Sequence, residues 1–559
     1  MNEKYIATTY NSFSRGVTPL LRGAGAEFKV IGYDTETAEG HIYLSGLYSE
    51  RGYVSCYGLG SDHVAFLVDE ALKHSEKHRR PVAVFVHNLA FDFGSLLFRL
   101  LLSSDRGAAP KESIFSHLQT KTTWTVSWTR PCFAKIRRGH SSIHVIDTLA
   151  YFKRSLAQAL IDIDAPVRKL EAPKDFDKGM IARKEIEPYH KRDCEGVYWL
   201  GKKIVSYWQA YDVRPCVSIP HMAGSIFRRR FLTAPFVKTS KLIDRVSMLS
   251  YHGGKNRFLG SPGWRTNVYE LDINSAYPEA MAQLPDFSRG RFKWVHRFVS
   301  TLGVYCVSGH VSRCRYGCIH SHDFKPLQGK IKRVWITGYE LDEALVSGEF
   351  IPERIYGVVF EPDPGPSPFR EFVEHFFRLK CEAKTKSEAE EPKLILNSAY
   401  GKFVARRFNP EKGQPRIAGS MFYPFIGTLI TGFVNAKIHR LEHKYNSFHT
   451  ATDSIKTIFK PDPQDIGKEL GKLKLEIFGD CLMLRNKLYV HKGYDGKIKV
   501  GLHGYQGDHA QLLQMWKNQK FDYVKIKLAK WAESWRLGIQ PGCAIERQME
   551  LLIERSSEK

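Results

Sequence analysis

The stretch Leu271-Asp272-Ile273-Asn274-Ser275-Ala276-Tyr277-Pro278 decides the fold of this 559-residue chain. It combines a short apolar strand that carries Asp272 with a turn that ends at Pro278. Far downstream, His449-Thr450-Ala451-Thr452-Asp453-Ser454 precedes a second apolar run, Ile455 to Phe459. The chain therefore carries two widely separated carboxylates, each placed beside a short apolar segment.

Three further acidic segments lie upstream of this pair. In Asp34-Thr35-Glu36, the two carboxylates sit at i and i+2 of a strand, share a face, and repel each other unless a cation lies between them. His87-Asn88-Leu89-Ala90-Phe91-Asp92 adds a third acid. In Tyr189-His190-Lys191-Arg192-Asp193, the first and last residues share a helical face, where the phenol can hold a water that a metal activates.

The pattern around these segments predicts the secondary structure. Residues 29–34 and 82–86 are β-rich runs, and residues 64–76 and 185–207 have helical periodicity, so the first 200 or so residues read as one α/β domain. Strands follow from about 265, with a long insertion at 300–365. Residues 368–405 are predicted to be helical with a break near Pro392, and 425–443 to be a further helix. Short strands and a basic tail are expected after 480.

The composition points to a polyanionic partner. The chain has 83 Lys and Arg against 59 Asp and Glu, a formal net charge of +24. Such a balance favours nucleic acid, although a basic protein can also merely tolerate its charge. Apolar residues make up 43% and charged residues 25%, which is typical of a chain that folds throughout.

Ten cysteines are scattered without a paired framework, which fits a reducing compartment. We therefore expect a cytoplasmic protein, in the host cytoplasm if it is viral, and the most apolar stretches are too short or too charged for a membrane span. One cluster could be read as zinc ligands: Cys306, His310, Cys314, Cys318, His320 and His322. The alternation from Val304 to His310 favours a strand instead.

Taken together, these motifs resemble a known family. The order Asp-x-Glu, Asn-x-x-Phe-Asp, Tyr-x-x-x-Asp is similar to the three exonuclease motifs of proofreading DNA polymerases, with the compact spacing of family B. The stretch at 271–278 resembles motif A of family B, and the stretch at 449–454 resembles motif C. Between them, Lys393-Leu-Ile-Leu-Asn397-Ser-Ala-Tyr400-Gly401 is similar to motif B.

The resemblance implies a polymerase site in which Asp272 and Asp453, from two strands, meet around a pair of Mg²⁺ ions. Mn²⁺ is expected to substitute, and the main chain of Ile273 to join the ligands. Two metals stabilise both the attacking 3′ oxygen and the leaving pyrophosphate. The nucleotide-binding residues implied are Ile273, Tyr277, Lys393, Asn397 and Tyr400. The last three share one predicted helical face, and Tyr277 excludes ribonucleotides, so the expected substrate is dNTP.

It also implies an exonuclease site with its own two metals. Asp34, Glu36, Asp92 and Asp193 would hold them, Tyr189 would assist, and either Lys169 or Arg168 would supply a catalytic cation. The residues expected to contact DNA are His87, Asn88, Phe91, Thr148 and Leu149 at the frayed 3′ end, Tyr251, Gly253 and Gly254 of a Tyr-x-Gly-Gly motif, and Lys487 and Tyr489 of a Lys-x-Tyr motif.

The implied architecture is α/β and α+β multidomain, with an RNase H-like exonuclease domain followed by a right-hand polymerase of palm, fingers and thumb. The expected boundaries are 1–210 for the exonuclease, 211–264 for a connecting segment with the Tyr-x-Gly-Gly motif, 265–299 for the first part of the palm, 300–367 for an insertion that binds a terminal protein, 368–424 for the fingers, 425–500 for the second part of the palm and 501–559 for the thumb.

The expected function is DNA-directed DNA synthesis with 3′–5′ proofreading. The long gap from Asp272 to Asn397 resembles the insertion of the protein-primed polymerases of phages and linear plasmids, so we predict protein-primed replication of a linear genome. The partners expected are primer–template DNA, dNTPs and a terminal protein, with the chain itself a monomer.

Three departures from the family pattern keep alternatives open. Ala451 replaces the first acid of motif C, Ala389 stands where a further basic residue is expected, and the spacing from Gly401 to Asp453 is short for a strand-displacement hairpin. The alternatives are an exonuclease with a degenerate polymerase half, a family B polymerase that needs no protein primer, and a DNA-binding protein without activity. The last is disfavoured because clustered carboxylates repel phosphate unless metals intervene.

Overall fold

The computed structural model describes residues 13–14, 16–21, 23, 28–38, 41–76, 82–89, 91–92, 118–119, 124–129, 133–138, 141–174, 179–321, 325–407, 417–505, 507–528 and 544–550. His322 lies outside these residues. Within the ranges given, no helix combines the length and the apolar character that a bilayer crossing requires.

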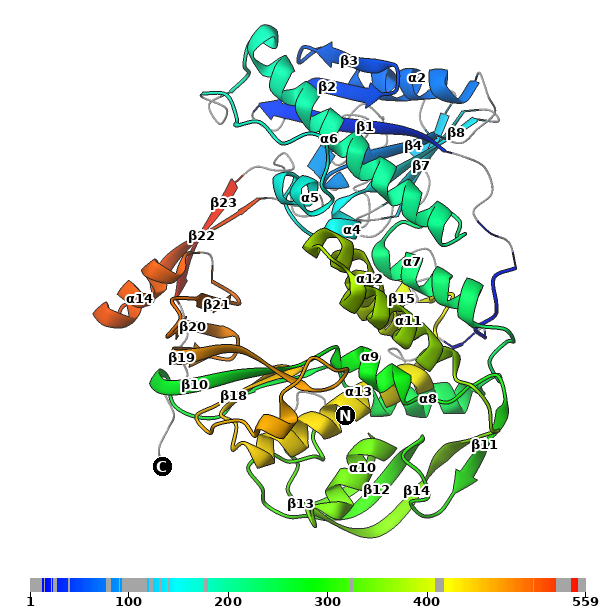
Figure 1. Ribbon diagram of the computed structural model, residues 1–559, viewed down its shortest axis with the longest axis vertical. Helices are drawn as coiled ribbons and strands as arrows, with labels where there is room; N and C mark the ends of the chain where they lie inside the picture. The colour runs from blue at the N-terminus through cyan, green and yellow to red at the C-terminus, as the bar shows by residue number, and fades with distance from the viewer. Residues whose placement is uncertain are drawn as a thin grey trace.

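An eight-stranded mixed sheet forms the N-terminal body, drawn at the top of Figure 1. Its strands β1, β4 and β8 run parallel to one another, and the others pair antiparallel. In sheet order they are β3 (Gly52–Tyr57), β2 (His41–Ser49), β1 (Lys29–Ala38), β4 (Val82–Val86), β8 (Ser141–Asp147), β7 (Phe133–Arg138), β6 (Trp124–Thr129) and β5 (Leu118–Gln119). The strands predicted at 29–34 and 82–86 are confirmed.

Two helices cover opposite faces of this sheet. Val84 of β4 packs in the same cluster as the buried residues of α2 (His63–Glu76), whereas its neighbour Phe85 packs with those of α6 (Arg183–Ala210). This alternation follows from the two-residue period of a strand that is buried on both faces. Both helices match their predicted positions. Two short helices, α4 (Leu149–Phe152) and α5 (Leu156–Asp162), follow β8.

A seven-stranded antiparallel sheet forms the second body, and the helices α8 (Lys241–Ser250), α9 (Ala276–Ala282) and α13 (Pro424–Lys444) pack beside it (Figure 1). The helix α7 (Ile219–Ile226), continued by a π-helical turn at Phe227–Phe231, leads into it from α6. The sheet order is β21 (Ile498–Leu502), β20 (Leu488–Gly493), β19 (Leu473–Arg485), β10 (Gly263–Ile273), β18 (Ser454–Thr457), β17 (His449–Thr452) and β9 (Lys255–Phe258).

A four-stranded sheet interrupts this body in sequence and packs below it in Figure 1. Its order is β11 (Gly290–Val295), β14 (Phe350–Pro362), β12 (Gly303–Val311) and β13 (Gly329–Thr337). The helix α10 (Gly338–Val346) packs against α13 and so joins the two sheets. The strand predicted around Cys306 is confirmed as β12.

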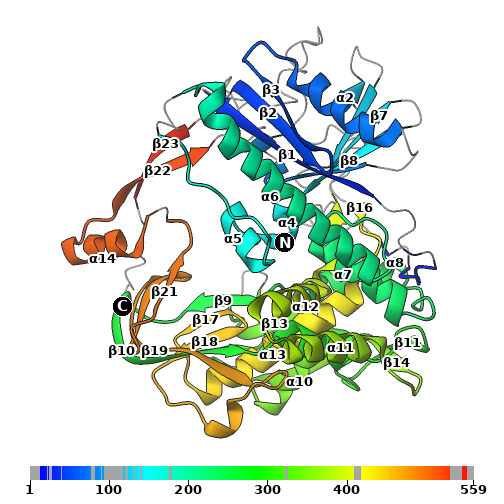
Figure 2. The same cartoon turned by 45° about the horizontal axis from the view of Figure 1, so that its top comes forward.

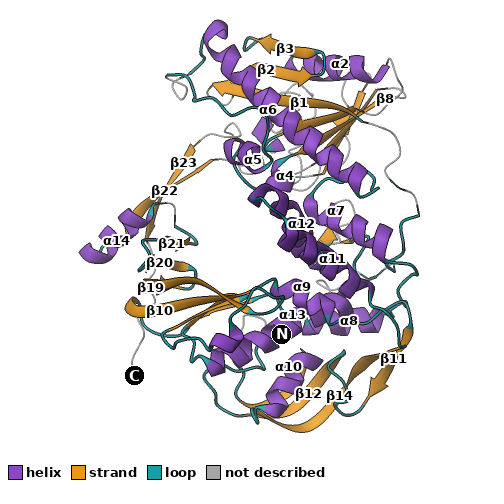
Figure 3. Ribbon diagram, viewed as in Figure 1, coloured by secondary structure: helices purple, strands orange, loops and turns teal. Residues whose placement is uncertain are grey.

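Two helices, α11 (Pro368–Glu382) and α12 (Lys386–Ser398), lie between the two large sheets (Figure 3). The predicted break near Pro392 is wrong, because the break falls at residues 383–385 and Pro392 lies inside α12. The hydroxyl of Thr385 caps the new helix by accepting from the Glu388 N–H at 3.2 Å. Full burial of Ile395 and Leu396 holds the helix together beyond the proline.

Short elements complete the chain. A 3₁₀ turn at Tyr400–Val404 precedes the hairpin of β15 (Arg406–Arg407) and β16 (Ile417–Ala418), and another lies at Pro463–Asp465. After 500 come α14 (His509–Asn518) and the hairpin of β22 (Asp522–Leu528) and β23 (Ala544–Glu550). The prediction of strands alone after 480 missed α14, which begins with a capping box at Asp508 and buries Leu512.

Gly32 on β1 allows α6 to approach the sheet closely, because a Cβ there would collide with the Cys194 carbonyl and the Tyr198 N–H of α6. We expect Gly32→Ala to destabilise the chain by about 1–3 kcal/mol through overpacking. Thermal unfolding measures this. Gly60→Ala is the matched control, since a Cβ there has no neighbour within 4 Å; equal melting temperatures for both variants would contradict the prediction.

Candidate active sites

Asp272 and Asp453 are neighbours in the folded chain. Strand β10 pairs antiparallel with β18 so that Asp272 lies opposite Ser454. At the end of β10, the Ile273 N–H donates to the carbonyl of Asp453 at 2.9 Å. Figure 2 shows β10, β17 and β18 side by side in the sheet. The turn between β17 and β18 therefore presents Asp453 beside the carboxyl end of β10, where Asp272 sits.

The two carboxyl groups repel each other. Burial, the Asp453 carboxylate and then Glu476 raise the pKa of Asp272 to about 7. Burial also raises the pKa of Asp453. A pair of partly buried acids with oxygen donors is the ligand set that Mg²⁺ prefers, and a bound cation would remove the repulsion. Glu476, on β19, is an acid of this site that the motifs did not indicate.

Backbone strain accompanies both acids. Thr452, which precedes Asp453, has φ 62°, and Ser275, at the start of α9, has φ 56°. A β-branched residue is rare in this left-handed region, so Thr452 is held there by its surroundings. The Asp453 N–H donates to the Ala451 carbonyl at 2.8 Å and closes the turn tightly. Ala451, whose side chain is not an acid, thus shapes the turn through its main chain.

An aromatic group lies beside the acids. The rings of Tyr277 and Tyr400 stack with centroids 4.1 Å apart and planes at 5°. A Cβ on Gly254 would come within 2.9 Å of the Tyr277 hydroxyl, so the glycine allows the main chain at residue 254 to lie close to Tyr277. Burial raises the pKa of both phenols, and Tyr251 adds to the rise in each, which places Tyr251 near them. Three of the predicted nucleotide- and DNA-binding segments therefore converge.

Motif B lies at the end of α12. Lys393 and Asn397 are exposed on this helix, one turn apart, as predicted. The α-helix ends at Ser398, and Tyr400 opens the 3₁₀ turn that follows. Gly401 lies in this 3₁₀ turn, and the Tyr400 ring at its start stacks on Tyr277.

Lys380 is a candidate site residue that the motifs missed. It lies in the last turn of α11, and its Nζ lies 3.3 Å from both Asn274 Oδ1 and Ser275 Oγ. Its cation therefore lies next to the motif A turn. Burial lowers the pKa of Lys380, and the nearby charge of Lys393 lowers it further. In the sequence, Lys380 is one basic residue among many, and only the packing of α11 against α9 singles it out.

A buried ion network lies beneath the acids. Glu270, two residues before Asp272 on β10, pairs with Lys456 of β18, with Lys499 of β21 at 2.7 Å, and with His491 of β20 at 3.4 Å. Burial alone would raise the pKa of Glu270, but the hydrogen bond from His491 and the two lysines hold this pKa well below its usual range. Lys456 also lies 4.0 Å from the ring centroid of Tyr489. The network thereby fixes the Lys-x-Tyr strand under the site.

The second carboxylate group gathers in the N-terminal sheet. Asp34 and Glu36 lie on β1, Asp193 on α6, and Asp92 follows β4. The hydroxyl of Thr35 donates to Asp92 Oδ1 at 2.6 Å. Burial, then Asp92, Glu36 and Asp193, raises the pKa of Asp34 well above its usual range. All four acids therefore share one buried volume.

The other acids of this group are perturbed in the same direction. Burial, then Asp193, raises the pKa of Glu36 to about 8, and burial raises that of Asp92 to about 7. His190 joins this group, because its ring nitrogen lies within 4.8 Å of carboxylate oxygens of Asp34 and Glu36. His190 was not predicted, although it lies next to Tyr189 in the third acidic segment.

Lys169, not Arg168, contacts the acids. Lys169 Nζ forms an ion pair with Asp193 and lies 4.6 Å from the ring centroid of Tyr189. Arg168 instead bonds the carbonyl of Val167 at 3.0 Å and pairs with Asp164 at 3.5 Å. Of the two cations that the sequence left as candidates, Lys169 is therefore the one that lies beside the acids. Tyr189 and Asp193 lie one turn apart on α6, as predicted.

The segments predicted to grip a DNA end meet at the same edge of the sheet. His87 bonds Thr148 Oγ1 at 2.8 Å. Asp147, at the end of β8, accepts N–H bonds from Asn88 at 2.9 Å and Leu149 at 2.8 Å. Asn88 has φ 85°. Asp147 was not predicted, yet its carboxylate joins the two loops that contain the predicted residues.

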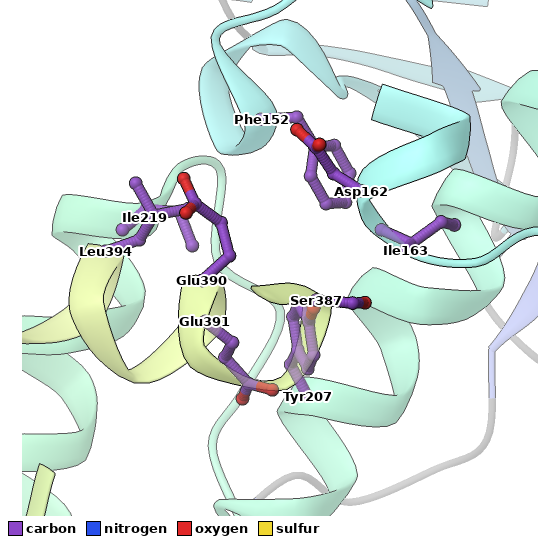
Figure 4. Close-up of a pocket in the computed structure, with 9 residues that line it drawn as sticks. All are labelled: Phe152, Asp162, Ile163, Tyr207, Ile219, Ser387, Glu390, Glu391 and Leu394. Carbon is purple, nitrogen blue, oxygen red and sulfur yellow. The ribbon is translucent and has the colours of Figure 1, made fainter. Parts of the chain in front are cut away.

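A pocket lies between the N-terminal body and α12 (Figure 4). Three acids, Asp162, Glu390 and Glu391, are among its lining residues. Arg154 pairs with Asp162 at 2.9 Å and with Glu390 at 3.6 Å, and Lys393 also lies 3.5 Å from Glu390. The wall of the pocket thus connects the two bodies through charge.

The zinc ligands considered from the sequence do not gather. Cys306 and His310 lie on β12, whereas the Cys314 thiol accepts the Gly317 N–H at 3.2 Å. Among the residues described, only His320 of that set belongs to a group with the spacing of metal ligands.

Comparison with known proteins agrees with this geometry. Residues 165–414 match the family described as DNA polymerase type B, organellar and viral. The chain is 24% identical over 330 residues to a probable DNA polymerase of Agaricus bitorquis, with 51% of this chain and 40% of that protein aligned. It is 22% identical over 406 residues to one of Ascobolus immersus, with 58% and 31% aligned. The chain thus spans less than half of each relative.

The fold is similar to that of a solved polymerase. Phi29 DNA polymerase complexed with primer–template DNA and incoming nucleotides matches 94% of this chain and 100% of its own, with a TM-score of 0.69 and 15% identity. Its complex with single-stranded DNA matches the same share at a TM-score of 0.68 and 16% identity. The predicted architecture, an RNase H-like domain followed by a right hand, is confirmed as the fold.

The raised carboxyl pKa values predict how stability depends on pH. Asp272 and Glu36 hold protons to about pH 7 and 8 in the folded chain and release them near pH 4 when unfolded. The stabilisation from these two protonated acids is therefore complete below about pH 4 and is lost progressively as the pH rises from there to about 7 and 8. We expect the melting temperature of the metal-free chain to fall between about pH 4 and pH 8.

Added Mg²⁺ should restore much of the loss, since it binds the ionised carboxylates. Asp272→Asn should flatten the pH dependence by removing one ionisation, on the order of 1–3 kcal/mol at alkaline pH. Calorimetry with and without chelator measures both effects, and a melting temperature that rises with pH in chelator would contradict the sign.

Proposed function

This chain is related to the type B DNA polymerases of organelles and viruses, and on that premise we propose that it is a DNA-directed DNA polymerase with a 3′–5′ proofreading exonuclease. The observation that carries the proposal is the pairing of β10 with β18, which sets Asp272 beside Asp453. Separated in sequence and adjacent in space, two such acids serve nucleotidyl transfer better than any structural role, because their repulsion destabilises the metal-free fold.

Asp272, Asp453 and the main chain of Ile273 would hold two Mg²⁺ ions. Bound there, the ions would lower the pKa of the primer 3′ hydroxyl and neutralise charge on the triphosphate. Side chains of the protein would contact the rest of the nucleotide. Lys393 and Lys380 would contact the triphosphate, and the Asn397 amide would lie against the base. The Tyr277 ring, held flat by Tyr400, would block a 2′ hydroxyl, which makes dNTP the substrate.

The four acids of the N-terminal sheet would hold the exonuclease metals. Lys169 neutralises Asp193 and lies against the Tyr189 ring, so the phenol is oriented to hold the attacking water. His87, Asn88, Phe91, Thr148 and Leu149 would grip the 3′ end, and Asp147 positions their loops. Primer–template DNA and dNTPs are the inferred partners, in keeping with the net charge of +24.

The domain assignment follows from these sites. We assign 1–210 to the exonuclease, 211–264 to the connection, 265–299 and 425–500 to the palm, 300–367 to the insertion, 368–424 to the fingers and 501–559 to the thumb. Three strands of the four-stranded sheet, β12, β13 and β14, lie in the insertion, whereas β11 lies in the first palm segment. The helices α11 and α12 lie in the fingers.

Exchanging single acids separates the two activities. We expect Asp272→Asn and Asp453→Asn to lower dNTP incorporation on a primed template by at least about 1,000-fold, since several kcal/mol of metal-dependent stabilisation is lost. Each should leave excision of a mismatched 3′ end intact, while Asp34→Asn should do the reverse. The rival function, a nuclease with a decayed polymerase half, is favoured by Ala451. It predicts instead that Asp272→Asn changes nothing.

Protein priming is the finer part of the proposal. The insertion is large enough to carry its own sheet and core, and it packs on α13 through α10. We expect a terminal protein, added with its origin DNA, to acquire a covalently linked first nucleotide, and Asp453→Asn to abolish the linkage. Synthesis only from DNA or RNA primers would show that the chain is a family B polymerase that needs no protein primer.

A further inference from the structure

A second kind of metal site lies away from both carboxylate groups. His252, His320 and Glu340 bring one ligand atom each to within 4.8 Å of the others, and all three side chains are buried. We propose that these residues bind a zinc-type divalent ion through two imidazole nitrogens and one carboxylate oxygen. This inference does not rest on the polymerase assignment.

The geometry suits zinc. His320 Nε2 and Glu340 Oε1 lie 3.5 Å apart. Ligands at about 2.1 Å from a tetrahedral zinc lie about 3.4 Å from one another, so this pair has the required spacing already. The rings of His252 and His320 are 4.6 Å apart at 84°, which allows each ring to turn one nitrogen toward a shared point. A two-histidine, one-carboxylate set leaves a fourth position for water.

The carboxylate is held in place by a second layer of contacts. Glu340 Oε2 accepts from the Thr337 hydroxyl at 2.7 Å, which leaves Oε1 directed toward His320. Asn435 Nδ2 donates to Glu340 Oε1 at 3.3 Å. The buried Oδ1 of Asn435 has no hydrogen-bond partner among the described residues, and a metal-bound water would supply one. Such outer contacts are typical of ligand-orienting shells.

The basic side chains near the site form their ion pairs with another acid. Lys255 and Arg257 both pair with Glu442 rather than with Glu340. Glu442 therefore opposes part of their charge and leaves the Glu340 carboxylate without an ion pair to either of them. The Cys318 thiol is engaged with the Glu340 carbonyl at 3.3 Å, so a nitrogen and oxygen ligand set is the one available. Mixed imidazole and carboxylate donors select zinc-type ions over Mg²⁺.

The site would join three separate segments. His252 lies in the Tyr-x-Gly-Gly loop after α8, His320 in the loop between β12 and β13, and Glu340 in the first turn of α10. Bound metal would therefore pin this loop to the four-stranded sheet. Asn435 of α13 strengthens the same link, since its Nδ2 also donates to the Gly253 carbonyl at 3.4 Å.

Metal analysis of the full chain tests the proposal. The Asp34→Asn, Asp272→Asn double variant in excess Mg²⁺ removes the carboxylate sites as competitors. After incubation with Zn²⁺ and gel filtration, we expect about one zinc per chain, the stoichiometry of a single site. His320→Gln and His252→Gln in this background should lose the zinc, and with it the rise in melting temperature that zinc binding produces.

His63→Gln is the matched control. His63 and His320 are equally buried, at 3% exposure each, but His63 bonds Ser45 Oγ at 2.8 Å and the Gly58 carbonyl at 3.0 Å. This variant should keep its zinc. If a ligand variant fails to fold, Co²⁺ added to the background protein decides: visible d–d absorption of four-coordinate cobalt, displaced by zinc, supports the site. Absence of bound zinc or of that absorption, or zinc retained by His320→Gln, overturns it.

Discussion

The repulsion between Asp272 and Asp453 is the constraint on which the second body is built. Antiparallel pairing of β10 with β18 brings the two acids together, and burial prevents water from screening them fully. The sheet tolerates this because Glu270, two residues away on the same strand, gathers Lys456, His491 and Lys499 around it. The cations around Glu270 therefore lie beneath the two repelling acids of the site.

The N-terminal sheet also holds repelling acids close together, but by a different arrangement. Its four acids come from strand β1, from the segment that follows β4 and from the long helix α6, and Lys169 forms an ion pair with Asp193. Close packing of α6 depends on Gly32, since any side chain there would push the helix and Asp193 away from β1. Here the distance between helix and sheet, rather than strand register, determines whether the acids can share metals.

Charge also connects the two bodies. Arg154, just after α4, pairs with Glu390 of α12, and Glu390 lies within 3.5 Å of Lys393. The lysine proposed to contact the triphosphate therefore shares its acidic partner with the N-terminal body. A movement of α12 relative to the N-terminal body would change the contact between Arg154 and Glu390.

The sequence by itself determined the order of the motifs and the strands and helices that carry most of them, because hydrophobic period and turn residues act locally. It indicated Asp272, Asp453, Asp34, Glu36, Asp92 and Asp193 correctly as acids that gather in two groups. It misplaced the helix break at Pro392 and missed α14, where capping and burial outweighed local preference. Only the tertiary structure showed that Lys169, and not Arg168, lies beside the acids, and revealed Lys380, Glu476, Asp147 and the His252, His320 and Glu340 group. Those assignments depend on which distant segments touch, and contact between distant segments is set by packing of the whole chain, which no local pattern records.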